Sequence, residues 1–78
     1  MLFEMVTKIL DTGKSKNVDL LTAKDMLCSE NPEDKGILDE ASEVLRDYYD
    51  EITEARRNGN ASVIAQCCDS FIAKKGNS

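Results

Sequence analysis

A row of carboxylates between residues 39 and 54 is the stretch of this 78-residue chain whose side chains could do chemistry. Spacings of three or four residues would gather most of them on one face of a helix. Acid–base chemistry would need burial that separates the pKa values of such carboxylates, and nothing in the surrounding sequence would bury them. Arg46 is the only base among them. We call this row the acidic ridge; its members are Asp39, Glu40, Glu43, Asp47, Asp50 and Glu54.

Two interpretations of the acidic ridge are open. Like charges four residues apart weaken a helix slightly, so selection for helix stability alone would have alternated the sign. The ridge is either a solvated face that keeps a small protein soluble or a docking surface for a basic protein partner. Tyr49 beside it has a large ring with a polar tip, which suits an interface. The predicted partner-binding residues are Asp39, Glu43, Asp47, Tyr49, Asp50 and Glu54.

Two adjacent cysteines, Cys67 and Cys68, are a second candidate. A disulfide between neighbours does not fit a regular helix. A metal site needs three or four ligands, but the chain has no His and Cys28 is its only other Cys. We therefore expect the pair to pack as small hydrophobes. Because Cys67 lies at the border of the expected apolar face, we predict partial exposure, which leaves a thiol-dependent role open.

Gly13-Lys14-Ser15 matches the end of a phosphate-binding loop in its letters only. That motif needs an earlier Gly at the position of Lys8 and a preceding strand, whereas the residues before Gly13 have helical spacing. The three residues are interpreted as a helix end and a polar turn. Without a nucleophile–base spacing, a metal set or a phosphate loop, we expect a protein that is not an enzyme, with no catalytic residues, no metal and no cofactor.

The charge balance bears on the partners. The net charge is −5 and the isoelectric point is about 4.6. Phosphates of nucleic acids and anionic membranes would repel this surface. We therefore expect no nucleic-acid and no membrane partner; a nucleic-acid-binding regulator is the rival hypothesis, and an acidic nucleic-acid mimic that inhibits a basic partner is a further one. The bases do not cluster but form separate pairs: Lys14 and Lys16, Arg56 and Arg57, Lys74 and Lys75.

The chain is too short for more than one domain, so we predict a single helical domain over residues 1–78 with 76–78 frayed. Three Cys and the lack of a secretory signal favour a reducing, cytoplasmic location. No stretch is apolar enough to span a bilayer. The residues carry the motifs of no known family, so the biological process stays open.

The apolar spacing predicts an all-α fold, a small bundle of four helices around one long central helix at about 32–58. Asn31 would cap that helix and Gly59 would end it, followed by an antiparallel C-terminal helix that Asn60 caps. Gly13 would end the first helix, and Asp19 or Thr22 would cap the second. The four helices are predicted at 2–12, 19–29, 32–58 and 61–74.

The predicted core follows the helical stripe. The apolar face of the long helix is longer than any helix available to cover it, so we expect uncovered surface at Phe3, Met5, Met26 and Tyr49. That surface predicts self-association, as a homodimer. The predicted core residues are Val6, Ile9, Leu10, Leu27, Leu38, Ala41, Leu45, Tyr48, Ile52, Ile64, Cys68 and Phe71.

Overall fold

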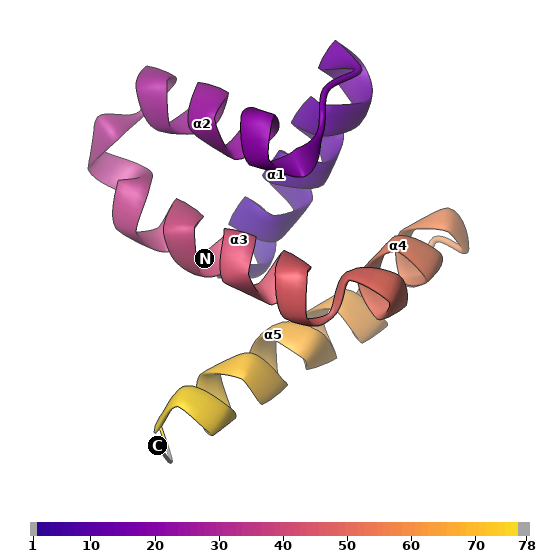
Figure 1. The fold of residues 1–78 in the computed structure, drawn as a ribbon. Coiled ribbons are helices and arrows are strands. Elements are labelled where there is room, and N and C mark those ends of the chain that lie inside the picture. Colours follow the sequence, from indigo (N-terminus) through magenta and orange to yellow (C-terminus); the bar gives the residue numbers. More distant parts are fainter. Residues whose placement is uncertain (1, 77–78) are drawn as a thin grey trace. The chain divides into compact units, whose positions relative to one another are not determined.

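The computed structural model describes residues 2–76. Over these residues the chain forms five α-helices and one short 3₁₀ helix, with no strand, so the predicted all-α class is confirmed (Figure 1). The elements are α1 (Leu2–Lys16), α2 (Leu20–Glu30), η1 (Pro32–Asp34), α3 (Lys35–Asp47), α4 (Tyr49–Arg57) and α5 (Ala61–Gly76).

The chain divides into two compact units, Met1–Glu43 and Val44–Ser78, with the boundary inside α3. In the first unit α2 packs against α1 and against η1. In the second unit α4 packs against α5. The prediction of one domain over residues 1–78 stays a prediction.

The first helix is longer than predicted, because Gly13 does not end it. Gly13 is buried inside α1, and a Cβ built there would lie 3.3 Å from the Val18 carbonyl oxygen and 3.4 Å from Leu20 Cδ2. The glycine therefore allows the start of α2 to approach α1 closely. Asn17 ends the helix instead, at a φ of 55°. The Val18 N–H donates to Gly13 O at 3.0 Å, which is the bond of a Schellman end.

The start of the second helix matches one of the two predicted N-caps. The Asp19 carboxylate accepts a hydrogen bond from the Thr22 N–H at 2.7 Å, so Asp19 is the N-cap and the alternative cap Thr22 is wrong. Hydrogen bonding from the Thr22 side chain, and next from its backbone N–H, lowers the pKa of Asp19. Asn31 was also predicted as a cap, but its side chain makes no capping bond to η1, and its backbone N–H ends α2 by donating to Leu27 O.

The long helix at 32–58 is the main error of the sequence prediction. The segment is divided into η1, α3 and α4, and the ribbon leaves the helical path between α3 and α4 (Figure 1). Tyr48 has φ −123° and ψ 30°, outside the α-helical region. Its neighbours explain the interruption. Asp50 and Glu51 are acids in the first turn of the new helix α4, where the helix dipole stabilises them.

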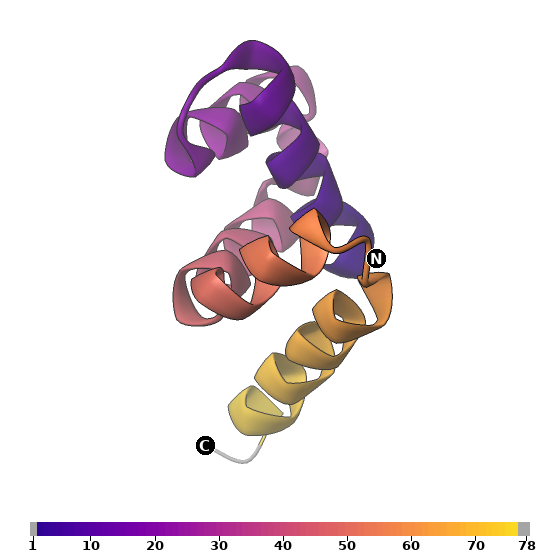
Figure 2. The ribbon, with the colours of Figure 1, turned by 90° about the vertical axis from the view of Figure 1, so that its right-hand side faces the viewer.

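The α4–α5 hairpin has the predicted antiparallel form, which Figures 1 and 2 show from two sides. Gly59 has φ +70° and follows α4 as predicted, and Asn60 N–H donates to Ala55 O at 2.7 Å. Asn60 directly precedes α5, and its side-chain oxygen accepts a bond from the Ser62 hydroxyl. Helix α5 continues to Gly76, past the predicted end at 74, while residues 77–78 of the predicted frayed end lie outside the described residues.

The predicted core is confirmed except at Tyr48, which is half-buried. The predicted uncovered surface is only partly right. Met5 is buried, Phe3 and Met26 are half-buried, and Tyr49 is 51% exposed. The other large exposed apolar side chains are Leu21 and Ile72.

Candidate functional site

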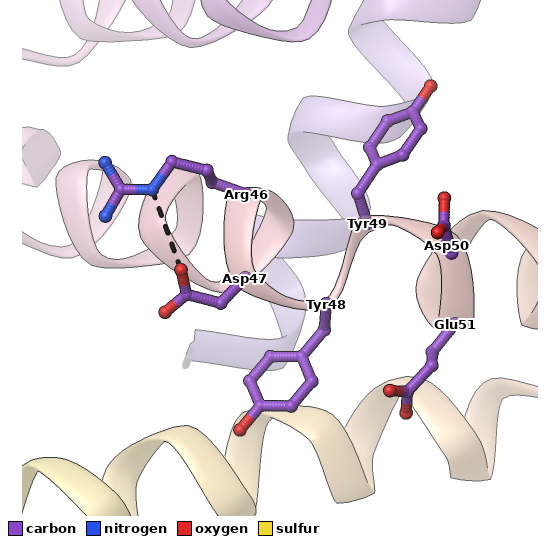
Figure 3. Close-up of a pocket in the computed structure, with 6 residues that line it drawn as sticks. All are labelled: Arg46, Asp47, Tyr48, Tyr49, Asp50 and Glu51. Carbon is purple, nitrogen blue, oxygen red and sulfur yellow. Dashed lines mark ion pairs between the residues drawn. The ribbon is translucent and has the colours of Figure 1, made fainter.

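The junction of α3 and α4 carries the densest group of predicted site residues. A shallow hollow lies there, within the second unit, and Figure 3 shows the side chains around it. Tyr48 and Tyr49 point to opposite sides of the chain (Figure 3). Tyr49 exposes about half of its surface, 51%, whereas Tyr48 is half-buried. The residues that line the hollow are Arg46, Asp47, Tyr48, Tyr49, Asp50 and Glu51.

The two sides of the junction differ in chemistry. Tyr49 and Asp50 point to one side, and Tyr48 and Glu51 point to the other (Figure 3). Asp50 is exposed, and Glu54, one helical turn further along α4, is exposed as well. Tyr49 and these two carboxylates therefore combine an accessible ring with negative charge.

Arg46 reduces the negative charge of the junction only in part. Its Nε lies 3.6 Å from Asp47 Oδ1, and both side chains are largely exposed. An exposed pair of this length contributes little to stability. Between residues 46 and 54 the remaining acids are Asp50, Glu51 and Glu54. The junction therefore keeps an excess of negative charge.

The acidic ridge does not form one continuous row. The predicted residues Asp47 and Asp50 lie on either side of the interruption at Tyr48, which breaks the helical spacing that grouped them. Glu43 is exposed on α3, and Glu40 is half-buried and takes part in an interaction within the chain. Asp39 is engaged in ion pairs. Of the predicted partner-binding residues, the structure brings Asp47, Tyr49 and Asp50 together at one junction, with Glu54 on the next turn.

Asp39 has two lysine partners within the first unit. Lys24 Nζ lies 2.8 Å from Asp39 Oδ1, and Lys35 Nζ lies 3.2 Å from Asp39 Oδ2. These bonds lower the pKa of Asp39, with Lys24 as the larger cause, and Asp39 in turn raises the pKa of Lys24. Asp39 is therefore a structural link between α2 and α3, in contrast to its predicted role in binding a partner.

Cys67 is buried, with 4% of its surface exposed, so the expected partial exposure was wrong. Its Sγ donates to the Glu51 carboxylate at 3.7 Å, which joins α5 to the first turn of α4. Burial raises the pKa of the Cys67 thiol, and the Glu51 charge raises it further. Burial also raises the pKa of Cys68. A neutral, buried thiol lacks the thiolate character that a reactive cysteine needs.

Sequence reasoning missed Glu51, Leu21 and Ile72. The signal for Glu51 was available, because two adjacent acids are typical of the first turn of a helix. Leu21 and Ile72 had no such signal, since both match the apolar spacing and only the packing leaves them exposed.

No helix within residues 2–76 has the length and apolar character needed to cross a membrane. Among the same residues, no three His, Cys, Asp or Glu side chains are grouped closely enough to hold a metal ion.

Comparisons of the chain with protein-family models, with curated proteins and with solved structures each find no match. The geometry of the junction is therefore the basis for a functional proposal.

Proposed function

We propose that this chain is a non-catalytic protein-interaction module that binds a basic partner through the α3–α4 junction. One observation supports this: the exposed Tyr49 ring lies on the same side of the junction as Asp50 (Figure 3). Aromatic rings beside charged groups are typical of interface anchors with a polar rim. Asp47 and Glu54 would extend the negative surface and guide a positively charged partner.

The proposal includes a cytoplasmic location for the chain. Cys28, Cys67 and Cys68 are all free thiols, which fits a reducing compartment.

The proposal also includes self-association of the chain as a homodimer. Tyr49 and Ile72 of the second unit each expose about half of their surface, 51% and 53%, and a second copy of the chain could cover such side chains.

The partner proposal can be tested by capture from the native host. The full chain is compared with an Asp47→Lys/Asp50→Lys variant and with a control, Asp25→Lys/Glu30→Lys, which makes the same charge change at exposed residues of α2. We expect a basic protein that the original chain and the control capture and the junction variant loses. Equal capture by all three, or equal loss in both variants, would contradict the proposed surface.

Sedimentation equilibrium at about 50 μM tests the dimer, because subunit association depends on concentration. A dimer is expected to give twice the 8.7 kDa mass of the chain. Ile72→Lys should then shift the distribution toward the monomer. A single species of 8.7 kDa would contradict self-association.

A further inference from the structure

The helix interruption at Tyr48 is placed where the sequence pattern continues without a break. Leu45 and Ile52 are seven residues apart, as in two turns of one helix, and both are buried. The helical hydrogen bonds reach Tyr48 from both sides. Its N–H donates to Val44 O and its carbonyl accepts from Ile52 N–H, each at 2.9 Å. Tyr48 thus makes a helical hydrogen bond with each helix, although its own backbone angles are not helical.

One change at Tyr48 would join α3 and α4. Its backbone would rotate from φ −123° and ψ 30° to about −63° and −42°. The amides of residues 49–51 could then donate to the carbonyls of residues 45–47, as the i to i−4 rule requires. The two bonds that Tyr48 already makes belong to both arrangements. The continuous helix is therefore reached by a local rotation that adds backbone hydrogen bonds.

Side-chain terms oppose this gain. In a continuous helix, Asp47 would lie one turn from both Asp50 and Glu51, and like charges at this spacing repel. In the interrupted form, Asp50 and Glu51 occupy the first turn of α4, where the positive end of the helix dipole stabilises them. Tyrosine at residue 48 also has a lower helix propensity than leucine. The interrupted form therefore depends on small terms that one substitution can change.

We propose that Tyr48 is a conformational joint between an interrupted and a continuous α3–α4 helix, and that the acidic side chains around it favour the interruption. Neutralising these carboxylates shifts the joint toward the continuous helix. A basic ligand would have the same effect to the extent that it binds the continuous form more tightly. The joint itself does not depend on the proposed function, since its states are defined by the backbone of residues 48–51.

NMR of the full chain tests the joint, with Cα chemical shifts at residue 48 and amide hydrogen exchange at residues 49–51. Tyr48→Leu keeps apolar bulk at a half-buried position and raises helix propensity. It should raise the population of the continuous helix about two-fold, the factor that the propensity difference gives. Tyr49→Leu is the matched control, because residue 49 is already helical, and it should leave the shifts at residue 48 unchanged.

A second variant tests the effect of charge without altering the tyrosine. Asp50→Asn, at an exposed residue, should move the Cα shift of Tyr48 toward helical values and slow exchange of the amides of residues 49–51. Asp25→Asn on α2 removes the same charge elsewhere and should do neither. Unchanged shifts and exchange in both Tyr48→Leu and Asp50→Asn, or equal changes in the two controls, would overturn the joint.

Discussion

Lys24 on α2 and Asp39 on α3 form an ion pair of 2.8 Å within the first unit. The Lys24 side chain is 19% exposed, so the pair is partly shielded on the lysine side. Lys35 contacts the second carboxylate oxygen from one turn earlier on α3. One residue that the sequence placed in a partner-binding ridge is thereby used to hold two helices of the chain together.

Removing Lys24 should raise the pKa of Asp39 toward its ordinary value of 3.8. Lys24→Gln removes the larger of the two stabilising hydrogen bonds, so its effect should exceed that of Lys35→Gln, the matched control. A carboxyl ¹³C titration by NMR measures both shifts. Equal pKa shifts of Asp39 in the two variants would contradict the larger effect assigned to Lys24.

The same pair gives a pH dependence of stability. The pKa of Asp39 is lower in the folded chain, so its contribution is present above the unfolded value and is lost as the pH falls through the folded pKa. Lys24 has a raised pKa, so its contribution is lost only as the pH rises above 10.5 toward the folded value. Acid unfolding curves of Lys24→Gln should therefore show a weaker loss of stability below pH 3.8 than the original chain.

Local rules predicted the helix ends that local chemistry determines. Gly59 was identified from its type and position, and Asp19 was one of two candidate caps, because a cap needs only a side chain or a backbone conformation close in sequence. Gly13 was wrongly predicted as a helix end. A glycine is needed there because Val18 and Leu20 approach it closely across the α1–α2 turn. The interruption at Tyr48 was missed because a prediction from apolar spacing takes no account of charged side chains. The acids around the tyrosine favour a new helix start there.

Gly13 and Gly36 should respond in opposite ways to alanine. A Cβ at Gly36 meets nothing within 4 Å, so Gly36→Ala should raise the free energy of unfolding by about 0.5 kcal/mol through helix propensity. At Gly13 the new Cβ would press on the Val18 carbonyl at 3.3 Å, and that backbone group has little room to move. Gly13→Ala should therefore lower the free energy of unfolding. Thermal or urea unfolding compares the two; stabilisation by both substitutions would show that α1 and α2 can separate slightly at no cost.

The two left-handed helix ends give a second matched pair. Asn17 has φ 55° and Gly59 has φ +70°, a conformation that glycine adopts without a Cβ penalty. Asn17→Gly should raise the free energy of unfolding by up to about 1 kcal/mol, and Gly59→Ala should lower it by about 1 kcal/mol or more. Urea unfolding of both variants measures these changes. A neutral Gly59→Ala would mean that the α4–α5 turn has another conformation in solution.

The sequence predicted most residues of the candidate site but not how they are arranged in space. The acids and Tyr49 were identified from their types, but the sequence placed Asp39 and Asp50 on one continuous face. A tertiary ion pair engages Asp39, and the interruption at Tyr48 places Asp47 at the end of α3 and Asp50 in the first turn of α4. Both effects need contacts or backbone rotations that a single helical wheel does not contain.

Cys67 should be slow to react with thiol reagents, despite its adjacent cysteine. Burial and the Glu51 charge raise its pKa, so the thiolate fraction at neutral pH is smaller than for a free thiol. Iodoacetamide labelling followed by mass spectrometry should modify the half-buried Cys28 first. Glu51→Gln removes the acceptor charge and should speed modification of Cys67, while Cys68, whose raised pKa does not involve Glu51, should change less. In denaturant all three thiols should react at similar rates. Labelling of Cys67 in the folded chain as fast as Cys28 would instead indicate an accessible, reactive thiol.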